Sequence, residues 1–508
     1  MKAKNPVILV VADGWGIAPP GRGNFISQAK TRFFSGLLAQ YPNSRNDASG
    51  NAVGLPQGAQ GNSEVGHLHM GAGRIVWQMY ELINRSIMDG SFRENSALVR
   101  AMKQVKKKGT LHLMGLCSDE GVHAHINHLT TLIEMASGAG LKDVAIHFFA
   151  DGRDVAEKSA MKYVETIAGA CRSMGTGRIA SIVGRYYSMD RDGNWDRTRQ
   201  AYEMLTEGRG FTAKNAKEAV EAAYARGDRT DYYIQPTIVG EPALIKDGDS
   251  VLFFNFRTDR PRQLTMAFTQ KDFSGFRRNI VPKVLYTTVS EYDKSYGLPF
   301  AFAEERVKNN LGEILSKKGL RQLRVAETEK YAHVTYFFNS QIEKPCKGEE
   351  RMMVSSPKVP SYDEKPEMSA AEVAEKTSAK IREKSYDFIL VNFANCDLVG
   401  HSAVKEAIIR AVEVVDACVG KVVETGLASG YTVIVTSDHG SAEDKLYPDG
   451  KPKPAHSCNP VPFIVASNDP KLKAVKLKNG GQKDVAPTIL DIMGLKKPKE
   501  MTGKTLIS

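Results

Sequence analysis

Short apolar runs rich in β-branched residues alternate with segments of helical periodicity along the whole chain. Each run is continuously apolar and is bounded by Gly, Asp or Asn, as expected for strands that helices cover on both faces. The clearest predicted strands are Val7–Ala12, Ala145–Phe149, Val251–Phe254, Phe388–Phe393 and Tyr431–Thr436. This alternation predicts an α/β fold built on parallel sheets.

The segments between these strands predict one clear helix and one long loop. Ala407–Thr425 carries apolar residues at helical spacing, and Lys344–Met368 is rich in proline and charge, which favours a loop. The apolar run Pro6–Ala12 is too short to span a bilayer, and it leads into Asp13 instead of a small-residue cleavage site. We therefore expect it to be a buried strand.

Composition narrows the class of protein. At 508 residues the chain should form two or more domains, and 42% apolar with 25% charged residues is typical of a soluble globular protein. The six scattered cysteines include no CxxC pair, which favours a reducing compartment. The net charge of +11 is spread along the chain, which favours a solvated surface with anion-binding arginines over a nucleic-acid site. We expect a cytoplasmic monomer that acts on a small acidic molecule and binds neither nucleic acid nor membrane.

Three predicted strands end at an aspartate, namely at Asp13, Asp397 and Asp438. Reactive groups gather at the carboxyl edge of open α/β sheets, so these carboxylates should converge. Histidines follow two of them, at His401, His439 and His456. Carboxylate and imidazole together suit divalent ions such as Mn²⁺, Zn²⁺ or Co²⁺, and this set is large enough for two ions.

A candidate nucleophile lies in the segment Gly61–His67. Ser63 follows a glycine-rich loop and precedes a predicted helix, where free amide groups favour a phosphoryl group. Two divalent ions and three carboxylates would leave a charge of about +1, which suits a phosphate dianion. Taken alone, a serine in this position is more often only the N-cap of the helix.

Arginines follow the strands in the middle of the chain. They occur in Asp151–Asp154, in Gly184–Tyr187, in Asp190–Asp192 and in Arg257–Arg262. Arginine is preferred where a planar carboxylate or phosphate is held by two hydrogen bonds. The interspersed aspartates leave a second interpretation open, in which the arginines only form surface ion pairs.

Four motifs, VADGWG, GNSEVGHLHMGAGR, NFANCDLVGHS and SDHGSAED, together resemble those of the cofactor-independent phosphoglycerate mutases of the alkaline-phosphatase superfamily. The likeness extends from Asp13 to His456, nearly the whole chain. One departure is Cys396, where members of the family commonly have proline. By this resemblance one metal ion would be held by Asp397, His401 and His456, and the other by Asp13, Ser63, Asp438 and His439.

The resemblance also implies roles in substrate binding and catalysis. Ser63 would be the nucleophile that becomes phosphoserine, Asp154 would move protons of the glycerate hydroxyls, and Lys330 would contact the transferring phosphoryl group. The residues that would bind phosphoglycerate are His123, Arg153, Asp154, Arg185, Arg191, Arg257, Arg260 and Lys330.

The resemblance finally implies an architecture and a reaction. Residues 1–76 and 310–508 would form a phosphatase-like dimetal domain, and residues 77–309 an inserted substrate-binding domain of the α/β class. The enzyme would interconvert 3-phosphoglycerate and 2-phosphoglycerate in glycolysis and gluconeogenesis without 2,3-bisphosphoglycerate. Mn²⁺ is the expected ion, with Mg²⁺, Co²⁺ and Zn²⁺ as alternatives. A metal-dependent phosphatase or a phosphopentomutase of the same superfamily is the alternative function.

Overall fold

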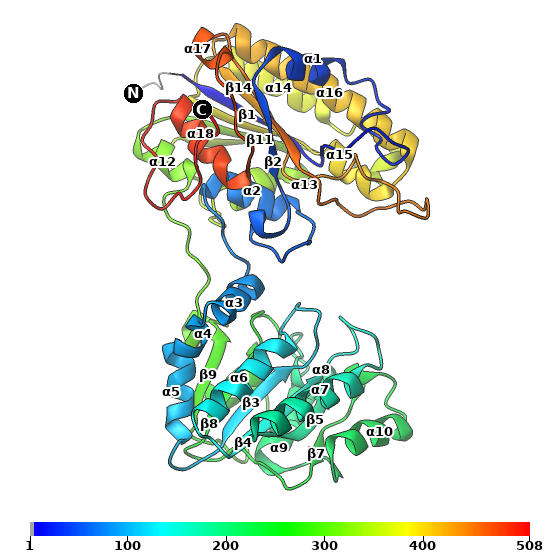
Figure 1. The fold of residues 1–508 in the computed structure, drawn as a ribbon, viewed down its shortest axis with the longest axis vertical. Helices are drawn as coiled ribbons and strands as arrows, with labels where there is room; N and C mark the ends of the chain where they lie inside the picture. Colours follow the sequence, from blue (N-terminus) through cyan, green and yellow to red (C-terminus); the bar gives the residue numbers. More distant parts are fainter. Residues whose placement is uncertain (1–4) are drawn as a thin grey trace. The chain divides into compact units, whose positions relative to one another are not determined.

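A computed structural model describes residues 5–508, which divide into two compact units. Unit 1 contains the chain up to Trp77 and from Glu305 onward, and unit 2 contains Gln78–Glu304. Figure 1 shows the consequence: α1 and α2 from the start of the chain share one unit with α14, α16 and α18 from its end, whereas α3 to α10 lie in the other. Unit 1 is therefore assembled from two distant stretches of sequence.

The sheet of unit 1 has the strand order β12-β11-β13-β1-β14-β15-β2-β16. The strands from β12 to β14 are parallel, and β15 runs antiparallel to both of its neighbours. The strand bounds are β1 Val7–Ala12, β2 Asn43–Asp47, β11 Gln322–Glu327, β12 Glu349–Val354, β13 Phe388–Phe393, β14 Thr432–Thr436, β15 Val461–Ala466 and β16 Gly480–Gly481.

Helices cover both faces of this sheet, as the continuous apolar strands require. Ile8 and Val10 of β1 pack into a core with α14 and α16, while Leu9 and Val11 pack with α12 and α18 on the other face. The helices of unit 1 are α1 Arg32–Gln40, α2 Ser63–Ala72, α12 Leu311–Lys317, α13 Thr328–Ala332, α14 Ala370–Arg382, α15 Asn395–Leu398, α16 Lys405–Ala428, α17 Pro470–Lys473 and α18 Val485–Ile492.

The sheet of unit 2 has the order β10-β9-β8-β3-β4-β5-β7-β6 and is parallel except between β5 and β7. Its strands are β3 Leu111–Leu116, β4 Val144–Ala150, β5 Arg178–Gly184, β6 Phe211–Ala213, β7 Thr237–Val239, β8 Ser250–Phe253, β9 Leu285–Ser290 and β10 Phe300–Phe302. Its helices are α3 Met79–Met88, α4 Ser91–Glu94, α5 Ser96–Val105, α6 Ile126–Gly138, α7 Ala160–Met174, α8 Arg185–Ser188, α9 Trp195–Glu207, α10 Ala216–Arg226 and α11 Arg262–Thr269.

Short turns complete the two units. They are Gly50–Val53, Asp231–Tyr233, Lys294–Tyr296, Tyr362–Glu364, Gly400–Ser402 and Gln482–Asp484, together with the π-helical turn His333–Phe337.

The expectation of a continuous loop over Lys344–Met368 is wrong, because this segment contains strand β12. β12 lies at the edge of its sheet, and only Val354 within it is buried. An edge strand can remain polar because no second neighbour covers it, so it lacks the apolar run that marks an interior strand. The predicted strands Val7–Ala12 and Phe388–Phe393 have the expected bounds, and the expected helix begins at Lys405 and ends at Ala428.

Candidate active site

The three aspartates at strand ends lie at one edge of the sheet of unit 1. β13, β1 and β14 are adjacent and parallel, so their carboxyl ends meet. Asp13 directly follows β1, Asp397 lies in α15 after β13, and Asp438 comes just after β14. All three are buried, with at most 2% of their surface exposed. The fold thus concentrates negative charge in a place that water does not reach.

The first group of possible metal ligands contains Asp397, His401 and His456. Asp397 Oδ1 lies 3.0 Å from His456 Nε2 and 3.4 Å from His401 Nε2, and the two imidazole Nε2 atoms are 3.3 Å apart. Each histidine places its Nδ1 against a backbone carbonyl: His456 lies 2.8 Å from Gly61 O, and His401 lies 3.2 Å from Pro454 O. That contact fixes the tautomer in which Nε2 is free to bind a cation.

The second group surrounds Asp13 and Asp438. His439 Nε2 is 3.5 Å from Asp13 Oδ1 and 3.7 Å from Asp438 Oδ2. His67, which our sequence analysis did not single out, lies 3.4 Å from Asp438 Oδ2 through Nδ1 and near Asn392, whose amide nitrogen donates to Asp13 Oδ2 at 2.8 Å. Every one of these side chains is buried.

Ser63 lies between these groups and is not the cap of its helix. Asn62 is the N-cap of α2, and its side chain accepts a hydrogen bond from the backbone amide of Val65. The Ser63 hydroxyl is therefore free for other contacts: it donates to Asp13 Oδ1 at 3.2 Å and lies 3.0 Å from His439 Nε2. The N-cap interpretation left open by the sequence is wrong.

Lys330 occupies the centre of the same cluster. It lies in α13, which follows β11, the neighbour of β13. Its Nζ donates to Ser63 Oγ at 2.6 Å, to Asp397 Oδ2 at 2.6 Å and to Asp13 Oδ1 at 2.8 Å. Burial alone would lower the pKa of Lys330, but the carboxylates of Asp13, Asp397 and Asp438 outweigh it and raise the pKa. The lysine is thus a fixed positive charge beside the candidate nucleophile.

Asp397 is held in its charged form. Burial opposes ionisation of Asp397, yet Lys330 and the neighbouring histidines lower its pKa well below the usual value. Burial would likewise lower the pKa of His439, but Asp438, Asp13 and Asp397 raise it to about 10. Without a metal ion, protons on histidine and lysine balance the buried carboxylates, a role that cations can take over.

The residues present fit a pair of divalent ions. Asp397 Oδ1 and Asp438 Oδ2 are buried and make no hydrogen bond, and each faces histidine nitrogens, the nearest at 3.0 Å from Asp397 Oδ1 and 3.4 Å from Asp438 Oδ2. Donor atoms bound at about 2.1 Å to one ion lie about 3.0–3.4 Å apart in octahedral or tetrahedral sites. The distances within the first group, 3.0 to 3.4 Å, match this spacing. By the closeness of their ligand atoms, two sets could hold an ion: Asp397, His439 and His456, which brings His439 to the first group as well, and Asp13, His67 and Asp438.

The arginine-bearing loops lie at the carboxyl edge of the sheet of unit 2. Asp151 directly follows β4, and Arg185 begins α8 directly after β5. Arg185 is 1% exposed, and its Nη1 donates at 2.6 Å both to Asp151 Oδ1 and to Asp154 Oδ2. Asp151 also accepts hydrogen bonds from the backbone amides of Arg153 and Asp154, so it shapes the loop that carries them.

A second aspartate, Asp259, organises the remaining cations of this edge. It accepts from Arg191 at 2.5 Å and from Arg257 at 3.2 Å, and it lies 3.8 Å from His123. Burial first, and then Arg185, lower the pKa of His123 to about 3, so its imidazole is neutral at pH 7. The side chains of Arg153, Arg191 and Arg257 are exposed and available to a ligand.

Arg260 shows that this edge carries surplus positive charge. It is buried and donates to the carbonyl of Met189 at 3.1 Å. Burial, and after it the neighbouring Arg185 and Arg191, lower the pKa of Arg260. Cations that repel one another in a sheltered place are stabilised when an anion binds among them.

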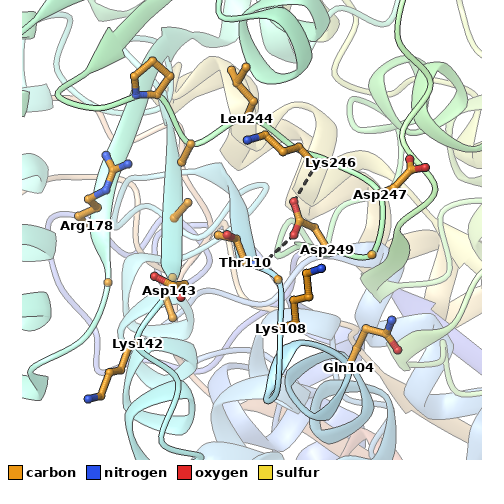
Figure 2. A pocket seen from close by; sticks show the side chains of 17 residues that line it. Gln104, Lys108, Thr110, Lys142, Asp143, Arg178, Leu244, Lys246, Asp247 and Asp249 are labelled. Atoms are coloured by element: carbon orange, nitrogen blue, oxygen red, sulfur yellow. Dashed lines mark hydrogen bonds between the residues drawn. The ribbon is translucent and has the colours of Figure 1, made fainter.

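The hollows of the molecule do not by themselves mark these sites. A cavity of about 790 Å³ lies at the opposite, amino edge of the sheet of unit 2, among residues that precede β3, β4, β5 and β8 (Figure 2). It contains Thr110 and Asp249 together with Lys108 and Lys142, but none of the candidate site residues. Helices α5, α6 and α7 end beside it, and lysines compensate the carbonyl ends of helices.

Three residues of the two sites were not found by sequence reasoning, namely His67, Asp151 and Asp259. Asp151 and Asp259 lie inside the arginine motifs, where an aspartate was interpreted as an ion-pair partner. His67 stands four residues after Ser63, a spacing that places both side chains on one face of a helix. That spacing is a signal that could have identified it.

Comparison with known proteins defines the class of this protein. Residues 279–495 match the family model described as sulfatase, and residues 83–294 match the model of the BPG-independent PGAM N-terminus. A sulfatase-like sheet with aspartate and histidine groups at its carboxyl edge belongs to the alkaline-phosphatase superfamily.

The particular family follows from full-length relatives. The 2,3-bisphosphoglycerate-independent phosphoglycerate mutase of Moorella thermoacetica is 48% identical over 99% of this chain and 98% of its own, and mutase 1 of Methanosarcina barkeri is 49% identical over 100% and 99%. The solved phosphoglycerate mutase of Leishmania mexicana at low cobalt concentration is 31% identical, covers 100% of this chain and 99% of its own, and has a TM-score of 0.61. The chain belongs to the 2,3-bisphosphoglycerate-independent phosphoglycerate mutase family, whose members use divalent metal ions.

Among residues 5–508, the structure contains no helix with the length and apolar character that crossing a membrane requires.

Proposed function

We propose that this protein is an isomerase that interconverts 3-phosphoglycerate and 2-phosphoglycerate in glycolysis and gluconeogenesis, independently of 2,3-bisphosphoglycerate. The observation that carries the proposal is the position of Ser63 Oγ, which accepts a hydrogen bond from Lys330 at 2.6 Å and lies 3.0 Å from His439. A hydroxyl beside a fixed ammonium and among cation-binding groups suits a nucleophile that carries a phosphoryl group. The names of the full-length relatives state this activity.

Two divalent ions, expected to be Mn²⁺ with Mg²⁺, Co²⁺ and Zn²⁺ as alternatives, belong to this proposal. One would be held by Asp397, His401 and His456, and the other by Asp13, Ser63, Asp438 and His439. When bound, such ions acidify a serine hydroxyl and neutralise charge on the phosphoryl oxygens. The oxygens of Asp397 and Asp438 that face histidine nitrogens without a hydrogen bond support this assignment.

The side chains of unit 1 would carry out the phosphoryl transfer. Ser63 Oγ, which enters this step deprotonated, attacks phosphorus while the bond between phosphorus and the glycerate oxygen breaks, which leaves phosphoserine and a glycerate oxygen that takes its proton from Asp154. The Lys330 ammonium and the free backbone amides at the start of α2 hold the phosphoryl oxygens. The reverse attack, by the other glycerate hydroxyl, returns Ser63 to its starting state.

Unit 2 would hold the glycerate during this exchange. Arginine side chains bind carboxylate and phosphate groups in pairs of hydrogen bonds, and His123 adds a neutral contact. Asp154 gives a proton to the oxygen that leaves phosphorus and later removes the proton from the other hydroxyl, so that the cycle balances. The arginines assigned to this binding are Arg153, Arg185, Arg191, Arg257 and Arg260.

The proposal extends to the whole molecule. Unit 1 is the phosphatase-like part and unit 2 the inserted transferase-like part of a cytoplasmic monomer whose partner is a small molecule. Size-exclusion chromatography with light scattering tests the oligomeric state: a mass near 55.8 kDa is expected, and twice that mass would contradict a monomer.

The function is tested by following 3-phosphoglycerate and 2-phosphoglycerate by phosphorus NMR with purified protein. We expect interconversion without added 2,3-bisphosphoglycerate, complete loss after treatment with chelator, and recovery on addition of Mn²⁺. Release of inorganic phosphate without isomerisation would instead identify a phosphatase. No conversion of either phosphoglycerate, together with isomerisation of a pentose phosphate, would identify a phosphopentomutase.

A further inference from the structure

Lys445 is a fully buried lysine that the proposed reaction does not use. Its Nζ donates three hydrogen bonds, to Ser441 Oγ at 2.9 Å, to Ala455 O at 3.1 Å and to Gly400 O at 3.2 Å. An ammonium group has three hydrogens, so each can find an acceptor. No carboxylate within residues 5–508 forms an ion pair with it, although burying an unpaired ammonium is costly. The position therefore calls for an explanation.

The three acceptors lie in three segments that carry candidate metal ligands. Gly400 immediately precedes His401, Ala455 immediately precedes His456, and Ser441 follows His439 by two residues. These segments approach closely, because a Cβ atom added at Gly400 would lie 2.8 Å from Ser441 Oγ. Lys445 thus joins three chain segments, each of which delivers an imidazole to the same edge of the sheet.

The two candidate groups differ in how much other support they have. Asp13, Asp438 and His439 are 0% exposed and follow central strands, so the core fixes them. His401 and His456 lie on loops, and their side chains are 49% and 16% exposed. Loop-borne ligands lose more conformational freedom when they bind an ion, unless other contacts have already ordered them.

Electrostatics does not explain the lysine. Burial lowers the pKa of Lys445 to about 8, and Asp397 is the carboxylate that opposes this lowering most. A positive charge within reach of Asp397 repels a cation held there, so the side chain would weaken metal binding if its charge were its main effect. Its benefit must come from the geometry of its three hydrogen bonds.

We propose that Lys445 is a positioning residue for one of the two metal ions: by tying the Gly400 and Ala455 carbonyls together it holds His401 and His456 ready to bind the ion that Asp397 shares. This inference rests on the dimetal function proposed above. Loss of the tie should weaken the site of Asp397, His401 and His456 and leave the site of Asp13, Asp438 and His439 unchanged.

The test is a titration of chelator-treated protein with Co²⁺. Calorimetry and the visible absorption of the bound ion monitor each binding step. Wild type should bind two ions. In Lys445→Met the affinity of one step should fall at least about tenfold while the other step changes less than about twofold. The variants His401→Asn and Asp438→Asn identify which step belongs to which site, and the weakened step should be the one that His401→Asn removes.

Matched variants separate positioning from charge and from general damage. Lys445→Arg keeps the charge and donors and should restore most of the affinity, and Ser441→Ala, which removes one of the three acceptors, should weaken the same step less. Lys453→Met is the control: Lys453 lies beside Lys445 across the same hairpin but pairs with Asp444 at 2.6 Å, so it should change neither step.

Each other outcome overturns the proposal. Equal weakening of both steps would mean that Lys445 only supports the fold, and tighter binding in Lys445→Met would mean that its charge dominates. If Lys445→Met does not fold, unchanged binding in Ser441→Ala would contradict the proposal. Failure of wild type itself to bind two ions would refute the dimetal function, and the role of Lys445 would fall with it; this result is distinguished by appearing before any variant is made.

Discussion

Both units bury serine, histidine and aspartate side chains beside their sheets, but the two sets are connected differently. In unit 2 a hydrogen-bonded chain crosses neighbouring strands: Ser181 Oγ lies 2.8 Å from His147 Nδ1, and His147 Nε2 lies 2.9 Å from His112 Nδ1. His112 Nε2 lies 3.2 Å from Asp249 Oδ2. In unit 1 the corresponding side chains crowd around a common centre, with Lys330 in its middle.

In unit 2, every side chain of the hydrogen-bonded series from Ser181 to Asp249 has a hydrogen-bond partner. Asp249 can only accept, so His112 donates to it from Nε2, and the two remaining contacts join an imidazole nitrogen to the neighbouring ring nitrogen or to the Ser181 hydroxyl. The other carboxylate contacts of Asp249 are the backbone amides of Thr110 and Lys246, both at 2.8 Å (Figure 2). No hydrogen-bonding atom of this series is left without a partner.

The cluster of unit 1 leaves some hydrogen-bonding atoms unpaired, and the pKa of its histidine shifts in the opposite direction from that of His147. Two of its carboxylate oxygens lack a hydrogen bond, and its acids raise the pKa of His439 to about 10 despite burial. In unit 2, burial, with His112 and Arg178, lowers the pKa of His147 well below its usual value. Similar residues thus serve two purposes: a complete hydrogen-bond set stabilises the fold, and an incomplete one is prepared for cations and substrate.

The substitution Ser63→Ala gives the largest expected effect. Removal of the nucleophile should lower kcat by about 10⁴-fold or more. The fold should remain, because Asn62 caps the helix and alanine is a good helix former. The measurements are isomerase turnover and circular dichroism, with a search for labelled phosphate on the protein. A variant that keeps more than about 1% of wild-type turnover would exclude Ser63 as the nucleophile.

Metal ions should stabilise the protein through the cluster of unit 1 only. At a free Mn²⁺ concentration about 100 times the dissociation constant, each site should add about 2.7 kcal/mol to the free energy of unfolding. Asp397→Asn should remove one of these contributions. Asp249→Asn should lower the stability of the metal-free protein but keep the full response to Mn²⁺. Denaturant titrations with and without metal measure both, and an equal loss of response in the two variants would show that the clusters do not differ.

The carboxyl edge of unit 1 could be predicted because each apolar strand ends at an aspartate, and adjacent parallel strands bring their ends together. Lys330 could not be found in this way, since a lysine in a short helix has no pattern of its own, and only the family resemblance pointed to it. Nor does the sequence show that His147 is a buried structural residue and not a metal ligand or a surface residue. It stands inside an apolar run, and its partners on β3 and β5 are set by strand register.

The substitution Ser181→Ala sharpens the comparison, because it is the same change as Ser63→Ala in the other cluster. It leaves His147 Nδ1 buried without a hydrogen-bond partner, which should cost about 1–3 kcal/mol of stability. Turnover should stay within about twofold of wild type, since Ser181 lies inside β5, before the strand end at which Arg185 stands. Denaturant midpoints and turnover are the measurements. A large loss of turnover at unchanged stability would mean that the hydrogen-bonded side chains of unit 2 have a catalytic role.

The acid response of His147 is the smallest and most specific expected difference. In the unfolded chain its pKa is about 6.5, whereas burial lowers it far below that value in the fold. Below about pH 6.5 the unfolded chain therefore binds a proton that the folded protein does not, and the free energy of unfolding falls as pH falls, by up to about 1.4 kcal/mol per pH unit. His147→Gln removes this titrating group, so the stability of the variant should fall less steeply between about pH 6.5 and pH 5. At neutral pH the variant should already be less stable than wild type, because the hydrogen-bonded series loses one member. Denaturant midpoints measured across this range in metal-free protein give both slopes.

The slopes should be equal above about pH 7.5, which serves as the internal control. Parallel curves over the acid range would mean that the folded protein already accommodates the proton on His147, and the contrast drawn between the two clusters would then be wrong.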